Sequence, residues 1–284
     1  MKKIIPIFLG ILLLYFVVNG LNISWLPFSN SSTAEAGEDI GTIDIHIAGG
    51  STVIIPEDRT DVSAELNGKG KAVVKEKGER IEVTVERRWY ESFPFYKKGD
   101  LKIYIPDDYT GSINLKLGSG NLRFSGLSPK EPMELNKLTV DVGSGNTKLE
   151  NLSVNRLTVD ESSGSVEISS MRAKHGTFDI SSGSTRLENY TGGIEAELSS
   201  GKFSAQLDDI NEDILLDVSS GEAVIDLPAD ADFTLKGEAG SGQITSSFPL
   251  KGNAGTDSNK FEGTYGSGKN LIEAEVSSGS IDIR

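Results

Sequence analysis

The chain has 284 residues, including 32 glycines, and a formal net charge of −14 at pH 7. This acidity argues against nucleic acid as a partner, because a phosphate-binding surface needs clustered Lys and Arg. The sequence has no cysteine, which excludes disulfides, thiolate metal sites, a cysteine nucleophile and lipidation of a cysteine. With only His46 and His175 as histidines, we predict no metal site, no cofactor and no catalytic residue.

An apolar segment begins at Ile4, directly after Lys2 and Lys3, and continues to about Leu26. It is long enough to span a bilayer. Lysines on its N-terminal side favour a cytoplasmic N-terminus. We therefore expect residues 1–27 to be a signal anchor, a single transmembrane helix in the cell membrane, with the C-terminal domain extracellular.

A cleaved signal peptide is the alternative interpretation of this segment. Ala34–Ala36 has the small-x-small form of a cleavage site, but it lies well past the apolar run. Residues 28–39 are small and polar, which is typical of a flexible tether. We favour a retained anchor followed by this tether.

Ser-Gly pairs recur along the rest of the chain. Gly145, Gly164 and Gly183 are 19 residues apart, and a period of about 19 to 20 residues indicates stacked supersecondary units. The first and the last gap between such pairs are longer. The glycines of the Ser-Gly pairs are Gly120, Gly145, Gly164, Gly183, Gly201, Gly221, Gly242 and Gly279.

Apolar residues alternate with polar ones on both sides of each Ser-Gly pair. Leu138, Val140 and Val142 precede one pair, and Val166 and Ile168 follow another. This period of two indicates half-buried strands, and two short strands bury their apolar faces only when copies stack. The sequence predicts an all-β fold, a right-handed parallel β-solenoid of about 19–20-residue coils, preceded by the transmembrane helix.

The Ser-Gly corners have a structural explanation. Glycine permits a positive φ or a close approach between coils, and serine hydroxyls can bond turn amides. The phosphate-binding patterns GxGxxG and GxxxxGK[ST] are absent, as is the calcium-binding GGxGxD repeat.

An acidic residue stands four positions before the glycine of each Ser-Gly pair, except the first pair, where Lys116 has that position. Alternation places this acidic ladder on the solvent side. It can be a solubilising face or a docking strip for cations or a cationic peptide, and we expect Arg123, Lys148 and Arg186 to neutralise it in part. The ladder comprises Asp141, Asp160, Asp179, Glu197, Asp217, Glu238 and Glu275.

Residues 40–110 follow the repeat less closely than residues 111–284, the Ser-Gly solenoid. Ile43, Ile45 and Ile47 precede Gly50, so we expect a first coil there, with His46 a surface residue and not a ligand. Residues 246–270 fill the longest gap between corners. We expect an irregular coil or a protruding hairpin there, before the final strands.

One segment of the N-terminal region combines aromatic and basic residues. It is either a membrane- or partner-binding loop or a hairpin whose rings cap the open end of the solenoid. The candidate residues are Arg87, Arg88, Trp89, Tyr90, Phe93, Phe95, Tyr96, Lys97 and Lys98.

The repeats "SSGSVEI" and "SSGSIDI", with the ending "GSGKNLIEAEVSSGSIDIR", resemble an adhesin-type family of bacterial β-solenoids whose function is unknown. A Lys-Lys anchor before such a domain is similar to the arrangement in LiaG-like proteins, encoded with the Lia cell-envelope stress system of Gram-positive bacteria. The resemblance covers about residues 40–284 plus the anchor. It implies the solenoid fold and an envelope context, with membrane stress-response proteins or the cell wall as partners, and it supplies no catalytic motif.

These features together favour a non-catalytic binding or scaffold protein outside the membrane, in a cell-envelope stress response. A surface adhesin or wall-polysaccharide-binding protein is the alternative. A solenoid enzyme acting on polysaccharide is more remote, because the carboxylates form an exposed row instead of a paired acid and base.

Overall fold

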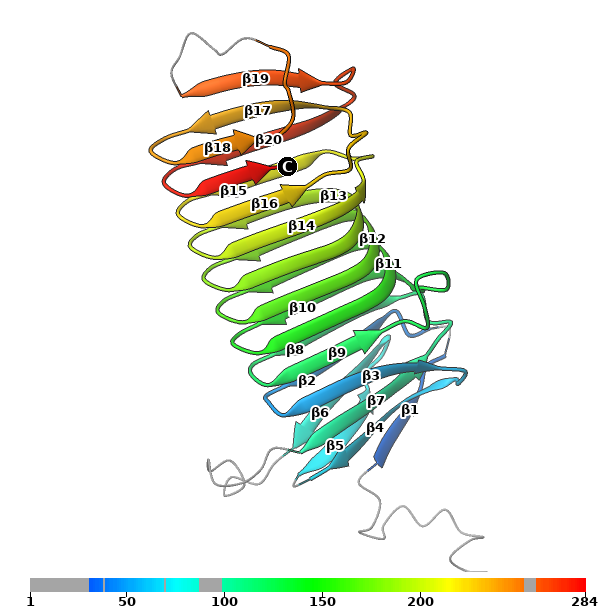
Figure 1. Cartoon of the computed structure of the whole chain (residues 1–284). Coiled ribbons are helices and arrows are strands. Elements are labelled where there is room, and N and C mark those ends of the chain that lie inside the picture. The colour runs from blue at the N-terminus through cyan, green and yellow to red at the C-terminus, as the bar shows by residue number, and fades with distance from the viewer. Residues whose placement is uncertain (1–30, 38, 69, 87–98, 253–258) are drawn as a thin grey trace, which may run out of the picture. The chain divides into compact units, whose positions relative to one another are not determined.

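The computed structural model describes residues 31–37, 39–68, 70–86, 99–252 and 259–284. Ser31–Arg284 form one compact unit, and its described residues contain strands and turns but no α-helix (Figure 1). The predicted all-β, solenoid-type fold is confirmed, whereas its right-handed sense stays a prediction. The predicted anchor at 1–27 lies outside the described residues, within which no helix is long and apolar enough to span a membrane.

Four long strands show how one coil stacks on the next. They are β10 (Met133–Val142), β11 (Asn146–Glu161), β12 (Ser165–Ile180) and β13 (Ser184–Leu198), paired in parallel. Leu157 pairs with Leu138 on one side and with Gly176 on the other, one coil length away. Leu157 and Val159 are fully buried between exposed or half-exposed neighbours. The alternation seen in the sequence thus produces the core.

Each coil has a strand that leads into its Ser-Gly corner and a strand that leaves it. We call the sheet of leading strands the leading face. It contains β2 (Thr42–Ile47), β8 (Ser112–Leu117), the C-terminal halves of β10 to β13, β15 (Ile214–Val218), β17 (Phe233–Ala239) and β20 (Asn270–Val276).

The sheet of strands that leave the corners is the trailing face. It contains β3 (Ser51–Glu57), β9 (Asn121–Ser125), the N-terminal halves of β11 to β13, β14 (Lys202–Asp209), β16 (Glu222–Asp226), β18 (Gln243–Ser246) and β21 (Ser280–Ile283).

The corners stack through backbone hydrogen bonds between coils. Ser163 N donates to Gly143 O at 2.9 Å, and Ser182 N donates to Ser162 O at 2.8 Å. A Cβ on Gly221 would lie 2.4 Å from the carbonyl oxygen of Gly201. At such corners glycine is therefore needed because two coils approach closely, while a positive φ accompanies it only at Gly50 and Gly120 among the corner glycines.

The coils do not stack in chain order at the C-terminal end. β20 and β21, the last strands of the chain, lie between β15–β16 and β17–β18 (Figure 1). The order of the coils in space therefore differs here from their order in the chain. The gap at 246–270 contains β19 (Lys260–Tyr265), which pairs antiparallel with β17, while residues 253–258 lie outside the described residues. Pairing with β19 covers the edge that β17 would otherwise expose.

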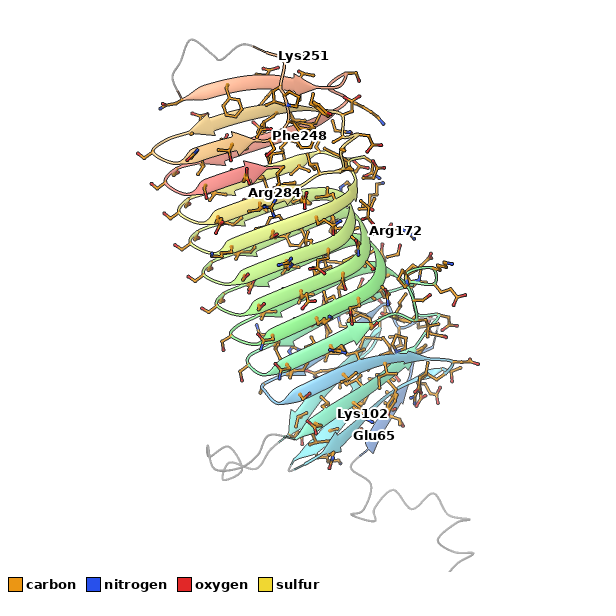
Figure 2. The ribbon with its side chains drawn as sticks, in the orientation of Figure 1. Glu65, Lys102, Arg172, Phe248, Lys251 and Arg284 are labelled. Carbon is orange, nitrogen blue, oxygen red and sulfur yellow. The ribbon has the colours of Figure 1, made fainter. Side chains whose placement is uncertain are left out.

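An aromatic cluster and a hydrogen-bonded turn complete this C-terminal end. Phe233, Phe248 and Tyr265 pack against one another with ring centroids 4.9 to 5.9 Å apart. Asp232 caps the turn between β19 and β20, accepting hydrogen bonds from the amides of Ser267 and Lys269 and from the Ser267 hydroxyl at 2.6 to 3.0 Å. These bonds lower the pKa of Asp232, with the Ser267 hydroxyl as the largest cause. Phe248 and the neighbouring Lys251 are labelled in Figure 2.

The N-terminal end repeats the same reordering. β6 (Arg80–Glu86) pairs with β2, and β7 (Asp100–Pro106) pairs with β3, on the sides opposite β8 and β9. The coil formed by β6 and β7 is therefore outermost, although it comes later in the chain than β2 and β3. Because β2 and β3 pair directly with β8 and β9, residues 40–110 and 111–284 share one continuous sheet.

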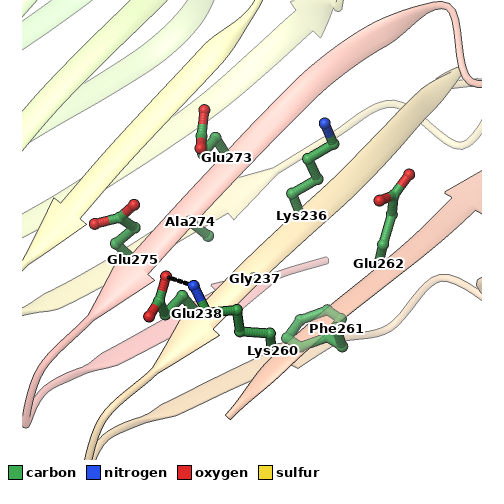
Figure 3. Close-up of a pocket in the computed structure, with 9 residues that line it drawn as sticks. All are labelled: Lys236, Gly237, Glu238, Lys260, Phe261, Glu262, Glu273, Ala274 and Glu275. Carbon is green, nitrogen blue, oxygen red and sulfur yellow. Dashed lines mark ion pairs between the residues drawn. The ribbon is translucent and has the colours of Figure 1, made fainter. Parts of the chain in front are cut away.

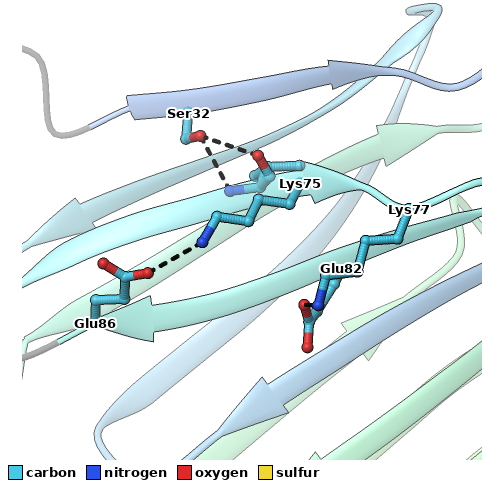
Figure 4. A network of polar contacts seen from close by, with 6 residues as sticks. Ser32, Lys75, Lys77, Glu82 and Glu86 are labelled. Atoms are coloured by element: carbon cyan, nitrogen blue, oxygen red, sulfur yellow. Dashed lines mark hydrogen bonds and ion pairs between the residues drawn. The ribbon is translucent and has the colours of Figure 1, made fainter.

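Antiparallel strands close this N-terminal end. β4 (Asp61–Asn67) pairs with β7 and with β1 (Ser31–Glu35), and β5 (Lys71–Glu76) pairs with β6. Between β1 and β5 the Ser32 hydroxyl bonds both backbone groups of Val74, accepting from its N–H at 3.0 Å and donating to its carbonyl at 3.4 Å (Figure 4). The Ser32 side chain thus provides the hydrogen bonds between β1 and β5 that backbone pairing would otherwise make.

Ser31–Glu35 were expected to belong to the flexible tether, and the structure places them in β1 instead. Ala34 lies opposite Val62 in β4 and packs against the hydrophobic core. The small side chains that suggest a tether also permit close strand pairing. Glu65 of β4 and Lys102 of β7 are register partners further along the same sheet (Figure 2).

Candidate binding surfaces

The acidic ladder lies in one register on the leading face. The structure brings all seven predicted residues together, in the order Asp141, Asp160, Asp179, Glu197, Asp217, Glu275, Glu238. Glu275 precedes Glu238 because the last coil is inserted, so the ladder is continuous only in the folded chain. Six of the seven residues are exposed and Asp141 is half-exposed.

A lysine pairs with the carboxylate at each end of the ladder. Lys116 Nζ lies 2.7 Å from Asp141 Oδ2, and Lys260 Nζ lies 2.7 Å from Glu238 Oε2. Within the part of the chain that the structure describes, the five carboxylates between them form no ion pair. The ladder is therefore a strip of excess negative charge with neutralised ends.

The charges within the ladder affect one another. The pKa of Asp160 is raised, first by partial desolvation and then by the neighbouring carboxylates of Asp179 and Asp141, with a smaller opposing effect from Lys116. Stacked strands are ~4.8 Å apart. A cation placed over the ladder would therefore meet two or three carboxylates at once.

The basic residues expected to neutralise the ladder lie elsewhere. Arg123, Lys148 and Arg186 come after the corner and so lie on the trailing face. Lys148 pairs with Glu167 at 3.0 Å, and Arg186 pairs with Glu188 at 2.8 Å. The expectation was wrong because the Ser-Gly corner turns the chain onto another face, which leaves the ladder less neutralised than predicted.

His46 continues the column beyond Lys116, which is its register partner. Its side chain is exposed. The described residues contain no group of three or more His, Asp and Glu side chains that could hold a metal ion. The prediction that His46 is a surface residue is therefore confirmed.

A hollow of about 440 Å³ lies at the C-terminal end of the ladder, over β17, β19 and β20 (Figure 3). Four glutamates and two lysines line it, with Phe261 at one side. Glu238 and Glu275 belong to the ladder, and Lys260 pairs with Glu238, its register partner on the adjacent strand. It is lined by Lys236, Gly237, Glu238, Lys260, Phe261, Glu262, Glu273, Ala274 and Glu275.

The aromatic-basic segment from Arg87 to Lys98 lies outside the described residues. Its flanks are described: β6 ends at Glu86, and β7 begins at Asp100. These two strands belong to the outermost coil, where β6 pairs with β2 and β7 pairs with β3. Its role at a membrane or partner stays a prediction. Nearby, Lys75 pairs with Glu86 and Lys77 with Glu82 (Figure 4).

The sequence interpretation missed two features. Glu161 is fully buried at a corner position where its register partners are Val142 and Ile180. Its carboxylate accepts bonds from Ser184 N at 2.9 Å and Thr185 Oγ1 at 2.6 Å. The signal was a charged residue in an otherwise apolar column of the repeat.

The second missed feature is a basic column on the leading face. Lys137, Arg156 and His175 each stand eight residues before a corner glycine and are register partners. Aligning the repeats at that position would have found them.

The stacked Ser-Gly coils, with polar columns on their outer faces, define a β-solenoid-type repeat protein. A family model for the Toastrack DUF4097 domain matches residues 40–284, and the chain belongs to this family. No curated protein matches the chain.

Several solved structures are similar to this chain. A protein from Bacteroides fragilis NCTC 9343, described as a "putative adhesin", matches with a TM-score of 0.50 at 14% identity, over 89% of this chain and 96% of that chain. A "putative adhesin" from Parabacteroides distasonis ATCC 8503 gives a TM-score of 0.48 at 12% identity, over 89% and 96% of the two chains. A "putative lipid binding protein" from the same organism gives 0.43 at 16% identity, over 90% and 97%. At these identities the likeness concerns the fold alone.

Proposed function

We propose that the protein is a non-catalytic binding or scaffold protein, anchored by residues 1–27 with its Toastrack domain outside the cytoplasmic membrane, and that the acidic ladder is its docking surface for a cationic partner. The observation that carries the proposal is the single continuous register of seven carboxylates, assembled from seven strands that include the inserted last coil.

The chemistry of the ladder suits a cationic protein segment or peptide. Its members are exposed or half-exposed and stand in one register across successive strands, so an extended chain with regularly placed Lys or Arg can contact several carboxylates in succession. Exposed pairs are individually weak, worth up to ~1 kcal/mol each. Binding therefore depends on several contacts at once and weakens with salt.

The envelope-stress role is part of the same proposal. The Lys-Lys anchor followed by a Ser-Gly solenoid is similar to the LiaG-like arrangement, which supports membrane stress-response proteins as partners. A surface adhesin or a wall-polysaccharide-binding protein is the alternative, and a polysaccharide-acting solenoid enzyme is the remote one. These alternatives need neutral sugar contacts or a paired acid and base, and neither uses the ladder as a continuous strip.

The test measures binding of an unstructured oligolysine peptide to the full chain in neutral detergent. The triple variant D160K/D179K/D217K should lose most of the salt-sensitive binding. The control E65K/D108K/D226K makes the same charge change at exposed or half-exposed carboxylates outside the ladder, and it should retain most of the binding. Equal loss in both variants would reduce the effect to net charge and remove the ladder as a specific surface.

A further inference from the structure

A basic cluster lies on the leading face, on the same strands as the acidic ladder but nearer their beginnings. Lys137, Arg156 and His175 are register partners on three consecutive coils, and Lys174 adjoins them. Together with Asn136 and Asn155 they line a hollow of about 430 Å³. Arg156, Lys174 and His175 are exposed and Lys137 is half-exposed.

Three other lysines of the coils pair with a carboxylate on a neighbouring strand. Lys116 pairs with Asp141, Lys148 with Glu167, and Lys202 with Glu222, all within 3.0 Å. By contrast, no ion pair involves any of the four basic residues of the hollow in the described part of the chain. Stacked like charges in an acidic protein are unfavourable unless an anion balances them.

The cluster has clear limits. Ser112 is the register partner of Lys137 on one side, and Gly193 is the partner of His175 on the other. Beyond His175 a second hollow is lined by Glu212 and Asp213, so the positive charge ends there. Arg172, on the preceding segment of the His175 coil, is also exposed (Figure 2).

We propose that this hollow binds a phosphate-bearing ligand. The Arg156 guanidinium can donate two parallel hydrogen bonds to phosphate oxygens, and lysine ammonium groups add point charges. The side-chain amides of Asn136 and Asn155 add hydrogen-bonding groups, and Asn155 Nδ2 already donates to Asn136 Oδ1 at 3.4 Å. Stacked cations ~4.8 Å apart suit an anion with several charges, such as a chain of phosphates, better than a single carboxylate.

The acidic ladder does not oppose this binding strongly. Arg156 and Asp160 are four residues apart on one strand, which corresponds to ~13 Å. At physiological salt the Debye length is about 8 Å, so the ladder is largely screened at the hollow. One face of the sheet thus offers a cation-binding strip and, beside it, a separate phosphate site.

The first test measures the affinity for tripolyphosphate by titration calorimetry on the full chain in neutral detergent. The variant K137Q/R156Q/K174Q should bind at least tenfold more weakly, whereas K71Q/K102Q/K130Q, an equal charge change at exposed lysines elsewhere, should change affinity by less than twofold. Equal weakening by both variants, or unchanged binding by the first, would overturn the proposal. Because these side chains are exposed or, at Lys137, half-exposed, both variants should unfold close to the temperature of the unsubstituted chain.

A second arm separates the sources of phosphate. The chain is titrated with soluble glycerol phosphate and, separately, with neutral micelles doped with phosphatidylglycerol. Binding of both, lost in K137Q/R156Q/K174Q, shows that the phosphate group itself is recognised. Binding of doped micelles alone, with the same loss, assigns the ligand to a lipid headgroup. Binding of either that survives in the variant contradicts the site.

Discussion

Removing one carboxylate from the interior of the acidic ladder should stabilise the fold. Asp179 has Asp160 and Glu197 as its two register partners. In the described structure none of these three carboxylates forms an ion pair. At ~4.8 Å in water two unit charges repel by ~0.9 kcal/mol, and physiological salt reduces this to ~0.5 kcal/mol. Two neighbours therefore give about 1 kcal/mol for Asp179→Asn, which keeps the side-chain volume.

Asp141→Asn is the matched control, because Asp141 has one like and one opposite neighbour. Relief of repulsion from Asp160 is offset by loss of the pair with Lys116. The expected change in the free energy of unfolding is close to zero. Urea unfolding of the full chain in neutral detergent, followed by circular dichroism, gives both values, and the gain in Asp179→Asn should grow at low salt.

The pH dependence follows from the raised pKa of Asp160, caused first by desolvation and then by Asp179 and Asp141. A raised folded-state pKa means that the destabilising charge is absent below the unfolded value of ~3.9 and complete above the folded value. The advantage of Asp179→Asn should therefore shrink as the pH falls toward 3. A loss of stability in this variant, or a gain independent of salt and pH, would refute the repulsion argument.

Three further predictions concern the corners, the core and the C-terminal turn. Gly221→Ala should cost about 2 kcal/mol or more in urea unfolding, because its Cβ would lie 2.4 Å from the Gly201 carbonyl oxygen; Gly41→Ala, with nothing within 4 Å, should change little. Glu161→Ala should cost about 2 kcal/mol by leaving buried partners unbonded, and Glu161→Gln should cost less; equal effects would contradict this. The lowered pKa of Asp232 means that its stabilisation is present above ~3.9 and is lost as the pH falls through the folded value. The protection of the amides in its turn, taken relative to their intrinsic exchange rate at each pH, should therefore fall in acid, and Asp232→Asn should abolish that pH dependence.

The repeat made the coil predictable, because alternation specifies which side chains are buried and the glycine spacing specifies the coil length. It could not specify the order of the coils. Each leading strand carries the same pattern, so β20 can pair equally well beside β15 or beyond β17 as far as the sequence shows. The antiparallel pairing of β19 with β17 decides the order, since it covers one edge of β17 and leaves the other for β20.

For the candidate surfaces, too, some features could be predicted from the sequence and others could not. The positions of the ladder residues were predictable, because they depend only on alternation within a strand. Their neutralisation was not, because the face on which Lys148 and Arg186 lie depends on the angle at the Ser-Gly corner. The seam between β1 and β5 at Ser32 depends on a contact between distant segments, for which one sequence offers no periodic signal. The position of Glu161 in an apolar column was visible in the repeat, but its bonds to Ser184 and Thr185 were not.

Photo-crosslinking in intact membranes tests the central claim most directly. A photo-reactive residue replaces Thr177 on the leading face of the full chain, or Ser204 on the trailing face as the control. The account predicts a specific membrane-protein product from position 177, absent from position 204 and lost when D160K/D179K/D217K is combined with the probe. Equal products from both positions, or a product at 177 that survives the charge reversal, would contradict the ladder as the docking surface.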